Sequence, residues 1–359
     1  MSSESLEGLN VVVKQPALSD DGPKSNKPWT YLSRFELTSR GYDKINCPVY
    51  ANGRQQIPVE IIMEARDEDG VVVDVNHSGL YLYLCLYNDI DVFPTELGRS
   101  GTQDSRYVYQ WPLASAEAGQ EATEHALVPR EGTERVQVVE QYVTATKVGA
   151  YKLAVRCRSP AKVVFATNTP NPPPGKFDSW LIVDARETVS VPLKDVALTV
   201  VNAVTTTDFD VDVYYVYFVD SNLRVVATEH NPDYPPNNQH YSWMHYSNSN
   251  SHYCYRKDEQ QSARYWSCYA YQWCDFPINE RAGAATLSRC TTKNVPNGKC
   301  GNWRQWGVYL GLINQYGNVS YVGVEPISHG NEIRLVDAAT KELGYGPDGP
   351  ACGHLDEMK

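Results

Sequence analysis

The sequence lacks an excess of positive charge. Its 359 residues contain 32 Lys and Arg against 43 Asp and Glu, which gives a formal net charge of −11 with the histidines neutral. Because contacts to nucleic-acid phosphates need a basic surface, this balance argues against a general nucleic-acid-binding protein. We therefore expect no nucleic-acid partner.

Long apolar runs are also lacking. No stretch approaches the roughly 20 residues that a membrane-spanning helix needs, so the sequence predicts no transmembrane helix. The opening residues, MSSESLEGLNVVVKQPALSDDG, contain no basic segment followed by an apolar one, as a conventional secretory signal would. We therefore expect a non-classical route to the extracellular space or to a cell or particle surface. A cytoplasmic inclusion is the alternative location.

Familiar catalytic motifs are the third absence. The sequence contains no HExxH, GxSxG or Walker motif. Gly344, Gly346 and Gly349 match GxGxxG, but Pro347 and Pro350 interrupt the run and no helical pattern follows. This glycine run therefore indicates a loop. The sequence as a whole indicates a protein that is not an enzyme and that needs no cofactor.

What the sequence has in abundance is alternation of apolar and polar residues. Residues 57–65 alternate in this way, and the DEDG that follows predicts a turn into a second strand. Residues 80–87, 135–143 and 151–157 show similar strand patterns. Evenly spaced strands with few helical patterns predict an all-β protein made of two β-sandwich-like domains.

Two segments resemble the opening and closing strands of bacterial immunoglobulin-like β-sandwich modules. The first is NGRQQIPVEIIMEARDEDGVVV, in which an NG pair leads into an alternating strand, a DG turn and an outgoing strand. The second is YVTATKVGAYKLAV, in which a Gly-Ala-Tyr step starts the last strand. The resemblance covers about residues 44–166 and implies a sandwich fold that surface and adhesive proteins often use. The middle of this segment is longer than in those modules, which leaves the strand order open.

The Pro-rich stretch TNTPNPPPGKFDS, residues 167–179, predicts an extended linker between two domains. Residues 1–29 then form an N-terminal extension, and residues 30–166 form the immunoglobulin-like domain. Residues 180–359 form a second β domain, in which we expect long loops rich in aromatic residues and cysteine over residues 230–300.

The nine cysteines fall into two groups. Cys47, Cys85 and Cys157 lie among apolar residues, which predicts small buried side chains on strands. The other six lie in or near a loop-rich region, which favours disulfide bridges: Cys254, Cys268, Cys274, Cys290, Cys300 and Cys352. Zinc binding is a weaker alternative because no CxxC pair is present. Six reduced thiols in a cytoplasm are a further alternative.

Residues 230–276 interleave Tyr and Trp with Asn, Ser, Gln and His. Rings with a flat apolar face beside adaptable polar groups are typical of recognition surfaces, where a sugar or a protein epitope is bound. The candidate ligand-binding residues are Tyr234, Tyr241, Trp243, Tyr246 and Tyr253. The alternative is that these rings pack around the cysteines and form a core.

Three carboxylates alternate along one predicted strand: Asp208, Asp210 and Asp212. Such a cluster of oxygens is a weak candidate for a calcium site if loops complete the ligand shell. A solvated end of a strand is the alternative. The apolar residues between and after them predict that the rest of this strand, through residue 219, is buried.

Three functions remain open. The first is a recognition protein of bacterial or phage origin, such as an adhesin or a receptor-binding or toxin subunit, whose partner is a cell-surface glycan or protein. The second is a structural protein of a particle or inclusion, which forms a homo-oligomer through its aromatic loops. The third is a β-type pore-forming toxin, for which residues 199–219 are the candidate membrane-inserting hairpin.

Overall fold

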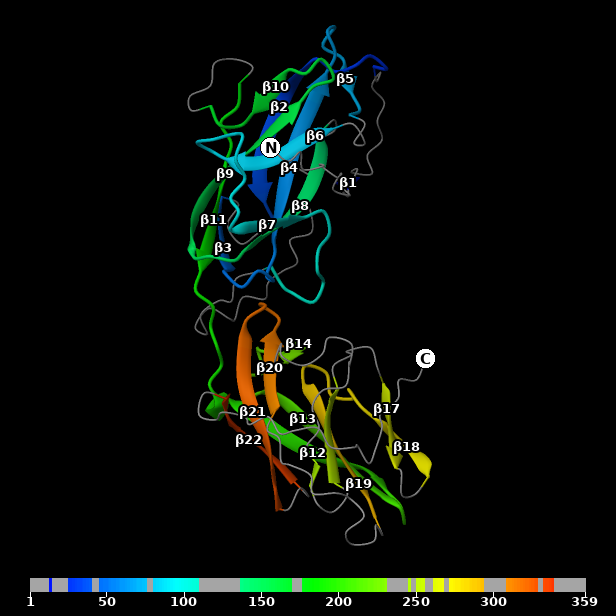
Figure 1. Ribbon diagram of the computed structural model, residues 1–359. Helices are drawn as coiled ribbons and strands as arrows, with labels where there is room; N and C mark the ends of the chain where they lie inside the picture. The colour runs from blue at the N-terminus through cyan, green and yellow to red at the C-terminus, as the bar shows by residue number, and fades with distance from the viewer. Residues whose placement is uncertain are drawn as a thin grey trace, which may run out of the picture. The chain divides into compact units, whose positions relative to one another are not determined.

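In the computed structural model, strands account for most of the described chain, which confirms the all-β prediction (Figure 1). The segment Leu193–Asp195 is a short 3-10 turn. Within the described residues, no helix has the length and apolar character needed to cross a membrane. The structure describes residues 13–14, 25–40, 45–75, 80–109, 136–169, 176–230, 245–246, 250–255, 261–267, 271–293, 308–328 and 332–338.

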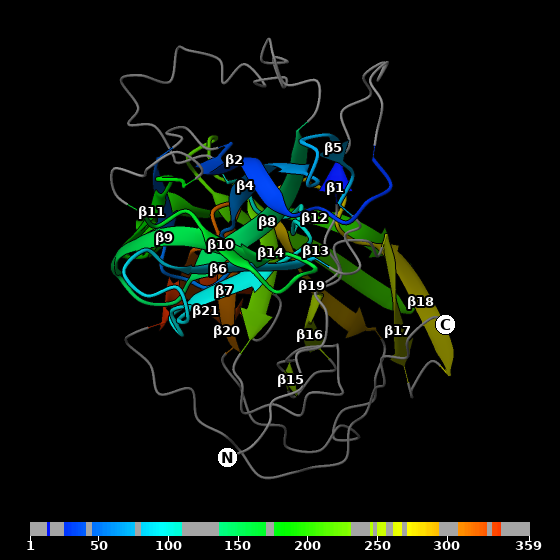
Figure 2. The same cartoon turned by 90° about the horizontal axis from the view of Figure 1, so that it is seen from above.

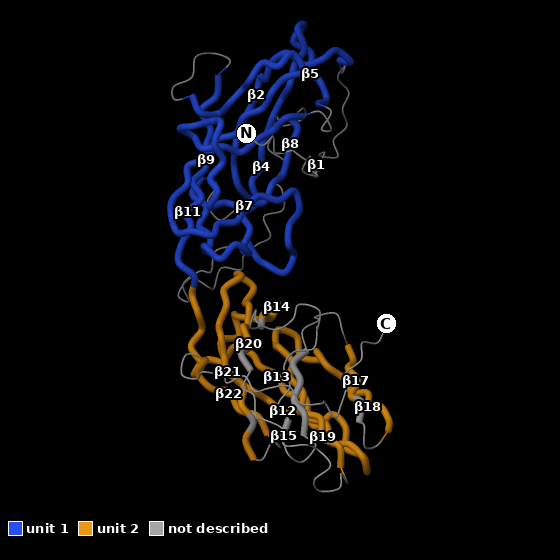
Figure 3. The backbone as a smooth tube through the Cα atoms, in the orientation of Figure 1, with its two compact units in different colours: residues 1–188 blue, residues 189–359 orange. Residues whose placement is uncertain are grey.

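The chain divides into two compact units, residues 1–188 and residues 189–359 (Figure 3). The first unit contains two sheets. The six-stranded sheet has the order β1 (Val13–Lys14), β8 (Gln137–Ala145), β4 (Ile57–Arg66) and β2 (Tyr31–Ser39), with β5 (Val72–Val73) on β4 and β7 (Leu97–Ser100) on β8. The five-stranded sheet has the order β10 (Val164–Ala166), β9 (Gly149–Arg158), β11 (Leu181–Arg186) and β3 (Asn46–Tyr50), with β6 (Tyr81–Leu86) on β9.

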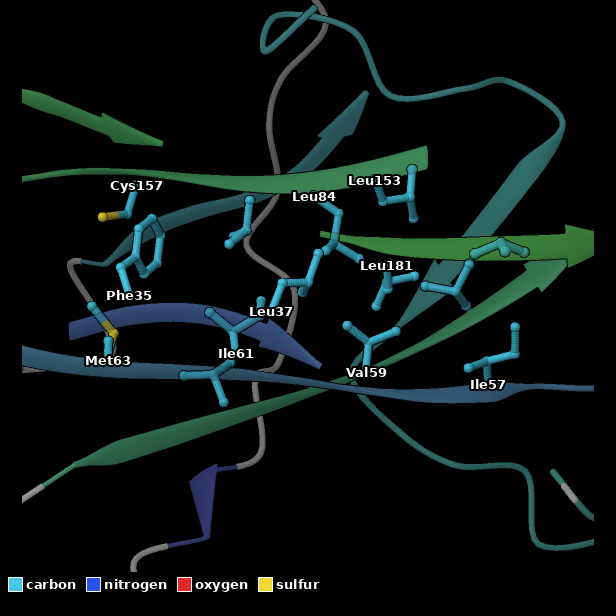
Figure 4. Close-up of a cluster of buried hydrophobic side chains, with 14 of the residues drawn as sticks. Phe35, Leu37, Ile57, Val59, Ile61, Met63, Leu84, Leu153, Cys157 and Leu181 are labelled. Carbon is cyan, nitrogen blue, oxygen red and sulfur yellow. The ribbon is translucent and has the colours of Figure 1, made fainter. Parts of the chain in front are cut away.

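A single apolar core lies between these two sheets (Figure 4). Alternate residues of β4, including Val59, Ile61 and Met63, point into it because successive side chains of a strand face opposite ways. Leu153 and Leu181 reach the same core from the other sheet. The first unit is therefore a β-sandwich, as the alternation predicts, and the antiparallel pairing of β4 with β5 confirms the predicted DEDG turn.

The boundary between the units differs from the one expected at the Pro-rich stretch. Strand β11 lies beyond that stretch, yet it pairs in parallel with β3, where Val183 meets Cys47, and antiparallel with β9, where Val183 meets Tyr151. Val183 is fully buried in the first core. Residues 181–186 therefore belong to the first unit, although the sequence assigned them to the second domain.

Both described ends of the Pro-rich stretch are bonded within the first unit. The amide of Ser179 donates to the carbonyl of Thr167 at 3.1 Å, and the amide of Leu37 on β2 donates to the hydroxyl of Ser179 at 2.8 Å. The ring of Phe177 packs edge-on against Phe35, with ring centroids 5.9 Å apart. These contacts make the ends part of the sandwich. Residues 170–175 lie outside the described residues.

The described residues of the second unit form three sheets (Figures 1 and 2). The central sheet has the order β12 (Val196–Thr205), β13 (Phe209–Phe218), β19 (Ala285–Thr292), β16 (Asn250–Tyr255) and β15 (His245–Tyr246). A second sheet has the order β14 (Val225–His230), β20 (Val308–Asn314), β21 (Val319–Ile327) and β22 (Glu332–Asp337). Strands β17 (Ser262–Ser267) and β18 (Gln272–Pro277) form a separate hairpin.

Strand β13 is buried on both faces. Tyr214 and Val216 enter a core shared with the four-stranded sheet. Val211 and Val213 enter another core, shared with the β17–β18 hairpin. The apolar residues of β13 are largely buried, as predicted, but Val219 is 60% exposed because the strand ends at Phe218. The second unit has apolar cores on both sides of its central sheet.

The structure corrects the disulfide prediction for two cysteines. Cys274 and Cys290 are free, buried thiols that belong to the core against the β17–β18 hairpin, so they take the place of apolar side chains there. Cys47, Cys85 and Cys157 are buried thiols on β3, β6 and β9, as predicted. The side chain of Cys254, and Cys268, Cys300 and Cys352 entirely, lie outside the described residues.

Candidate functional site

The predicted ligand-binding residues of the aromatic segment fall largely outside the described residues. Tyr234, Tyr241 and Trp243 are not described. The backbones of Tyr246 and Tyr253 lie on β15 and β16, where they are the register partners of Asn250 and Ser288. The side chains of these two tyrosines are not described. Ligand binding by the aromatic segment therefore stays a prediction.

The aspartates at the start of β13 face an arginine. The side chain of Arg289 on β19 is only 5% exposed, and its Nη2 lies 2.6 Å from Oδ2 of Asp210. Its Nε donates to Oδ2 of Asp212 at 2.9 Å. Burial alone lowers the pKa of this guanidinium, but hydrogen bonds to the two carboxylates outweigh it and the net shift is upward. The third candidate, Asp208, instead accepts a hydrogen bond from Gln272 at 2.9 Å.

This arrangement gives two of the three predicted calcium ligands a cation from the protein itself. Asp210 and Asp212 form ion pairs with Arg289, and a carboxylate held in this way has less capacity for a metal ion. Across the part of the chain that the structure describes, no group of three or more His, Cys, Asp or Glu side chains is placed to hold a metal. Asp210 and Asp212 thus form an ion-paired strand end, while Asp208 is hydrogen-bonded to Gln272.

A different cluster lies on the outer face of the five-stranded sheet in the first unit. On β6, Leu84 points into the core, so Tyr81 and Tyr83 occupy the opposite, outward face. Tyr83 is the register partner of Arg156 on β9, whose guanidinium carbon lies 5.5 Å from the ring centroid. Arg99 of β7 approaches the same ring, with its guanidinium carbon at 5.7 Å. Tyr81 remains 59% exposed.

A third cation and two more rings continue this outer face. The ammonium nitrogen of Lys152 lies 3.5 Å from the ring centroid of Tyr87 and 4.3 Å from that of Trp180. Tyr87 donates a hydrogen bond to Oδ1 of Asp178 at 2.6 Å, and this bond is the main reason that the pKa of Tyr87 is raised. The two rings pack with Cys85 in a small apolar cluster.

We call this surface the cationic–aromatic face. It comprises Tyr81, Tyr83, Tyr87, Arg99, Lys152, Arg156 and Trp180. The strand alternation of residues 80–87 predicts that Tyr81, Tyr83 and Tyr87 share one face of a strand that is covered on both sides, whereas Tyr81 is 59% exposed. Their cations could not be predicted, because they come from β7 and β9 and meet the rings only in the folded sheets.

The cations on this face differ in how their charge is balanced. Arg156 forms an ion pair with Asp91. Among the described residues, Arg99 contacts the rings of Tyr83 and Phe93 and forms no ion pair. Lys152 likewise contacts rings and forms no ion pair within the described chain. Within the described chain, two positive charges therefore lie on aromatic rings without an ion-pair partner, in a protein whose formal charge is −11.

The side chains of this face are suited to binding an anionic group beside a flat apolar one. Arginine and lysine donate charge-assisted hydrogen bonds to carboxylate, sulfate or phosphate groups. Tyrosine and tryptophan offer flat apolar faces with a polar edge. Two carboxylates contact this face, and both are already bonded: Asp91 to Arg156 and Asp178 to Tyr87.

No protein-family model matches the chain. No curated protein matches it either. Among solved structures, the C-terminal domain of the Streptococcus pyogenes antigen I/II-family protein AspA aligns over 81% of this chain and 99% of that chain, with 6% sequence identity and a TM-score of 0.23. The Yersinia pseudotuberculosis adhesin InvE aligns over 82% of this chain and 61% of that chain, with 10% identity and a TM-score of 0.18. Scores this low establish neither a shared fold nor a shared function.

Proposed function

We propose that this chain is a non-enzymatic recognition protein of bacterial or phage origin that acts outside the cell or at a cell or particle surface. Its partner is a cell-surface glycan or protein. The observation that supports this proposal is the cationic–aromatic face, where Arg99 and Lys152 lie on aromatic rings and form no ion pair with any described residue.

An acidic glycan suits this face best. A sugar ring can stack on an exposed aromatic side chain, and Tyr81 is 59% exposed. A carboxylate or sulfate on the sugar can accept hydrogen bonds from Arg99 and Lys152, whose charges have no carboxylate beside them in the described chain. Tyr, Trp and Arg are also the residues that contribute most to binding at protein interfaces, so an acidic protein epitope is the competing ligand.

The pore-forming alternative has less support. The candidate hairpin corresponds to β12 and β13, which pair antiparallel as expected. Strand β13 is also paired with β19, and its two faces fill two separate cores through residues such as Val213 and Val216. Release of this hairpin would therefore require both cores of the second unit to open.

The proposal can be tested by binding to an array of acidic glycans and their neutral counterparts. We expect the protein to bind acidic glycans, with affinity that falls as salt is added because the contact is partly ionic. The double variant Arg99→Gln with Lys152→Met should bind at least about tenfold more weakly, since it removes two charge-assisted contacts. Its melting temperature should stay close to that of the wild type.

A matched control is Arg264→Gln in the second unit. Arg264 also approaches a ring, Trp273, with its guanidinium carbon 5.6 Å from the ring centroid, but it forms an ion pair with Asp275. This variant should bind as the wild type does. Equal binding by wild type and the double variant would contradict the proposal. Binding to whole cells that survives enzymatic removal of glycans would assign the face to a protein ligand instead.

A further inference from the structure

One exposed tyrosine of the second unit lies across a glycine on the outer face of the four-stranded sheet, where β14, β20 and β21 are neighbours (Figure 1). Leu310 and Leu312 point into the core, so Gly311 between them faces outward. Gly311 is the register partner of Glu229 on β14 and of Tyr321 on β21. These three residues therefore form one row across three strands, on the side of the sheet away from its core.

The glycine in the middle of this row lets the tyrosine ring reach the strand beyond it. A Cβ atom on residue 311 would lie 3.1 Å from Cε1 of Tyr321 and 2.6 Å from Cγ of Glu229. A residue with a side chain at this position would therefore displace the ring, the carboxylate or both. The hydroxyl of Tyr321 reaches across β20 and donates a hydrogen bond to Oε1 of Glu229. The ring is thus held against the sheet.

The held ring remains open to solvent. Tyr321 is 55% exposed, so the side of the ring that does not rest over Gly311 faces water. An exposed side chain usually loses conformational freedom when it binds a ligand, and this loss weakens binding. Because Gly311 and Glu229 already fix the ring of Tyr321, it is preorganised for stacking.

The group beside the ring decides which ligand suits it. In the first unit the ring of Tyr83 lies between two arginines, whereas the ring of Tyr321 lies beside the carboxylate of Glu229. A carboxylate repels an acidic sugar, but it accepts charge-assisted hydrogen bonds from neutral hydroxyls. It has about four acceptor positions, so Glu229 can accept from a sugar hydroxyl as well as from Tyr321.

The other charges of this face also fit a neutral ligand. Arg334 on β22 is the register partner of Glu325, which lies four residues from Tyr321 on the same face of β21. The two form an ion pair at 2.7 Å, so they add no net charge. A cation would be attracted to Glu229, but cations recognised by aromatic rings are held in cages of several rings, whereas Tyr321 lies across the sheet.

We propose that Tyr321 is the stacking platform of a separate binding site, which takes a neutral sugar ring of an oligosaccharide. The sugar stacks on the exposed side of the ring, and its hydroxyls donate hydrogen bonds to Glu229. This site does not depend on the cationic–aromatic face, because it lies in the other unit and carries the opposite charge. Its affinity should therefore change little with salt, unlike the affinity for an acidic glycan.

Binding of the full chain to a panel of neutral oligosaccharides of glucose, galactose or mannose tests the proposal. The wild type should bind at least one member of the panel, with the same affinity at low and high salt. Tyr321→Ala should bind that oligosaccharide at least about tenfold more weakly, since it removes the stacking surface. The matched control is Tyr31→Ala in the first unit, which removes a ring that is 40% exposed and should leave binding unchanged.

Two further variants keep the ring of Tyr321 in the chain. Gly311→Ala places a Cβ atom where the ring and Glu229 now lie, so binding should weaken at least about threefold. Glu229→Gln keeps the shape of the side chain and an acceptor for Tyr321 but removes the carboxylate. It should also weaken binding about threefold, with an unchanged melting curve. These variants decide the proposal even if Tyr321→Ala lowers stability by uncovering Gly311.

The contrary outcomes are distinct. A wild type that binds no member of the panel would overturn the proposal, as would Glu229→Gln and Gly311→Ala that both bind as the wild type does. Binding of tetramethylammonium that depends on Tyr321, without sugar binding, would assign the ring to a cation and overturn it too. Neutral sugar binding that is lost in Arg99→Gln with Lys152→Met but kept in Tyr321→Ala would place the sugar on the first unit. Failure of acidic glycans to bind would contradict the cationic–aromatic face alone.

Discussion

Arg289 on β19 and Asp212 on β13 are register partners, and their side chains form an ion pair across the two strands. The side chain of Arg289 is 5% exposed and that of Asp212 is 16% exposed. Asp210, two residues earlier on β13, binds the same guanidinium at 2.6 Å. One buried cation therefore holds two carboxylates at the end of the central sheet.

We expect Arg289→Met to lower the free energy of unfolding by about 3–5 kcal/mol, because it leaves two partly buried carboxylates without their partner. Denaturant titration measures this loss. The matched control is Arg264→Met on the β17–β18 hairpin, where Arg264 pairs with Asp275, which is 54% exposed. Exposed pairs contribute about 0–1 kcal/mol, so this control should change stability little. Similar losses in both variants would show that burial does not strengthen the Arg289 cluster.

Because the first unit extends to residue 188, a fragment that ends earlier should fold less well than one that ends there. A fragment of residues 1–188 contains β11 and the whole first core, so it should fold and melt cooperatively. A fragment of residues 1–179 ends at the boundary expected from the Pro-rich stretch and lacks Leu181 and Val183, which are both fully buried. Each such loss costs about 2–5 kcal/mol, against about 5–15 kcal/mol for a whole domain.

Circular dichroism and thermal melting of the two fragments decide this prediction. The longer fragment should show a β spectrum and a cooperative transition, whereas the shorter one should show no such transition. A shorter fragment as stable as the longer one would mean that β11 adds nothing to the first unit and would restore the boundary at residues 167–179.

Strand β4 could be predicted from sequence because its alternation is local. Val59, Ile61 and Met63 are separated by polar or differently directed residues, and that pattern alone defines a buried face. Strand β11 carries a similar local signal, but its place in the first unit depends on parallel pairing with β3, more than a hundred residues earlier. No local pattern states which distant strand will be its neighbour.

The cationic–aromatic face could likewise be predicted only in part from the sequence. Sequence places Tyr83 and Tyr87 on one face of a strand, but Lys152 comes from β9 and Trp180 from the residue before β11. Their meeting depends on strand pairing within the folded sheet. The Arg289 cluster was missed in the same way, because the alternation of Asp210 and Asp212 does not reveal the arginine opposite them on β19.

Burial of the first unit's cysteines predicts a loss of stability in alkali. Burial raises the pKa of the Cys157 thiol from an ordinary value of 9.0 to about 12, and that of Cys85 to about 11. The folded state then keeps protons that the unfolded state releases. Their contribution to stability is full below pH 9.0 and is lost as pH rises towards the folded values.

Melting temperature measured as a function of pH checks this sign. We expect the wild type to lose stability as pH rises above 9.0, and Cys157→Ala to lose less over the same interval, since alanine does not titrate. The comparison with wild type removes the contribution of tyrosines and lysines that titrate in both proteins. Equal slopes for the two proteins would contradict the role of Cys157. As a second readout, alkylation of native protein below this range should leave Cys157 unmodified, because the thiolate is the reactive form.

Trp243 and Tyr246 of the aromatic segment are the alternative to the cationic–aromatic face as the ligand-binding residues. If their rings bind the ligand, Trp243→Ala and Tyr246→Ala should each weaken binding by about 1–3 kcal/mol, as truncation of a central anchor does, with an unchanged melting curve. If the rings form a core instead, the same variants should lose about 3–5 kcal/mol of stability whether or not ligand is present. Titration calorimetry and thermal melting on the same samples separate the two cases. The same measurements on the double variant Arg99→Gln with Lys152→Met show which of the two surfaces binds the ligand. Loss of binding confined to the Arg99 and Lys152 variant would reject the aromatic segment as the binding site, since the ligand would then depend on the first unit alone.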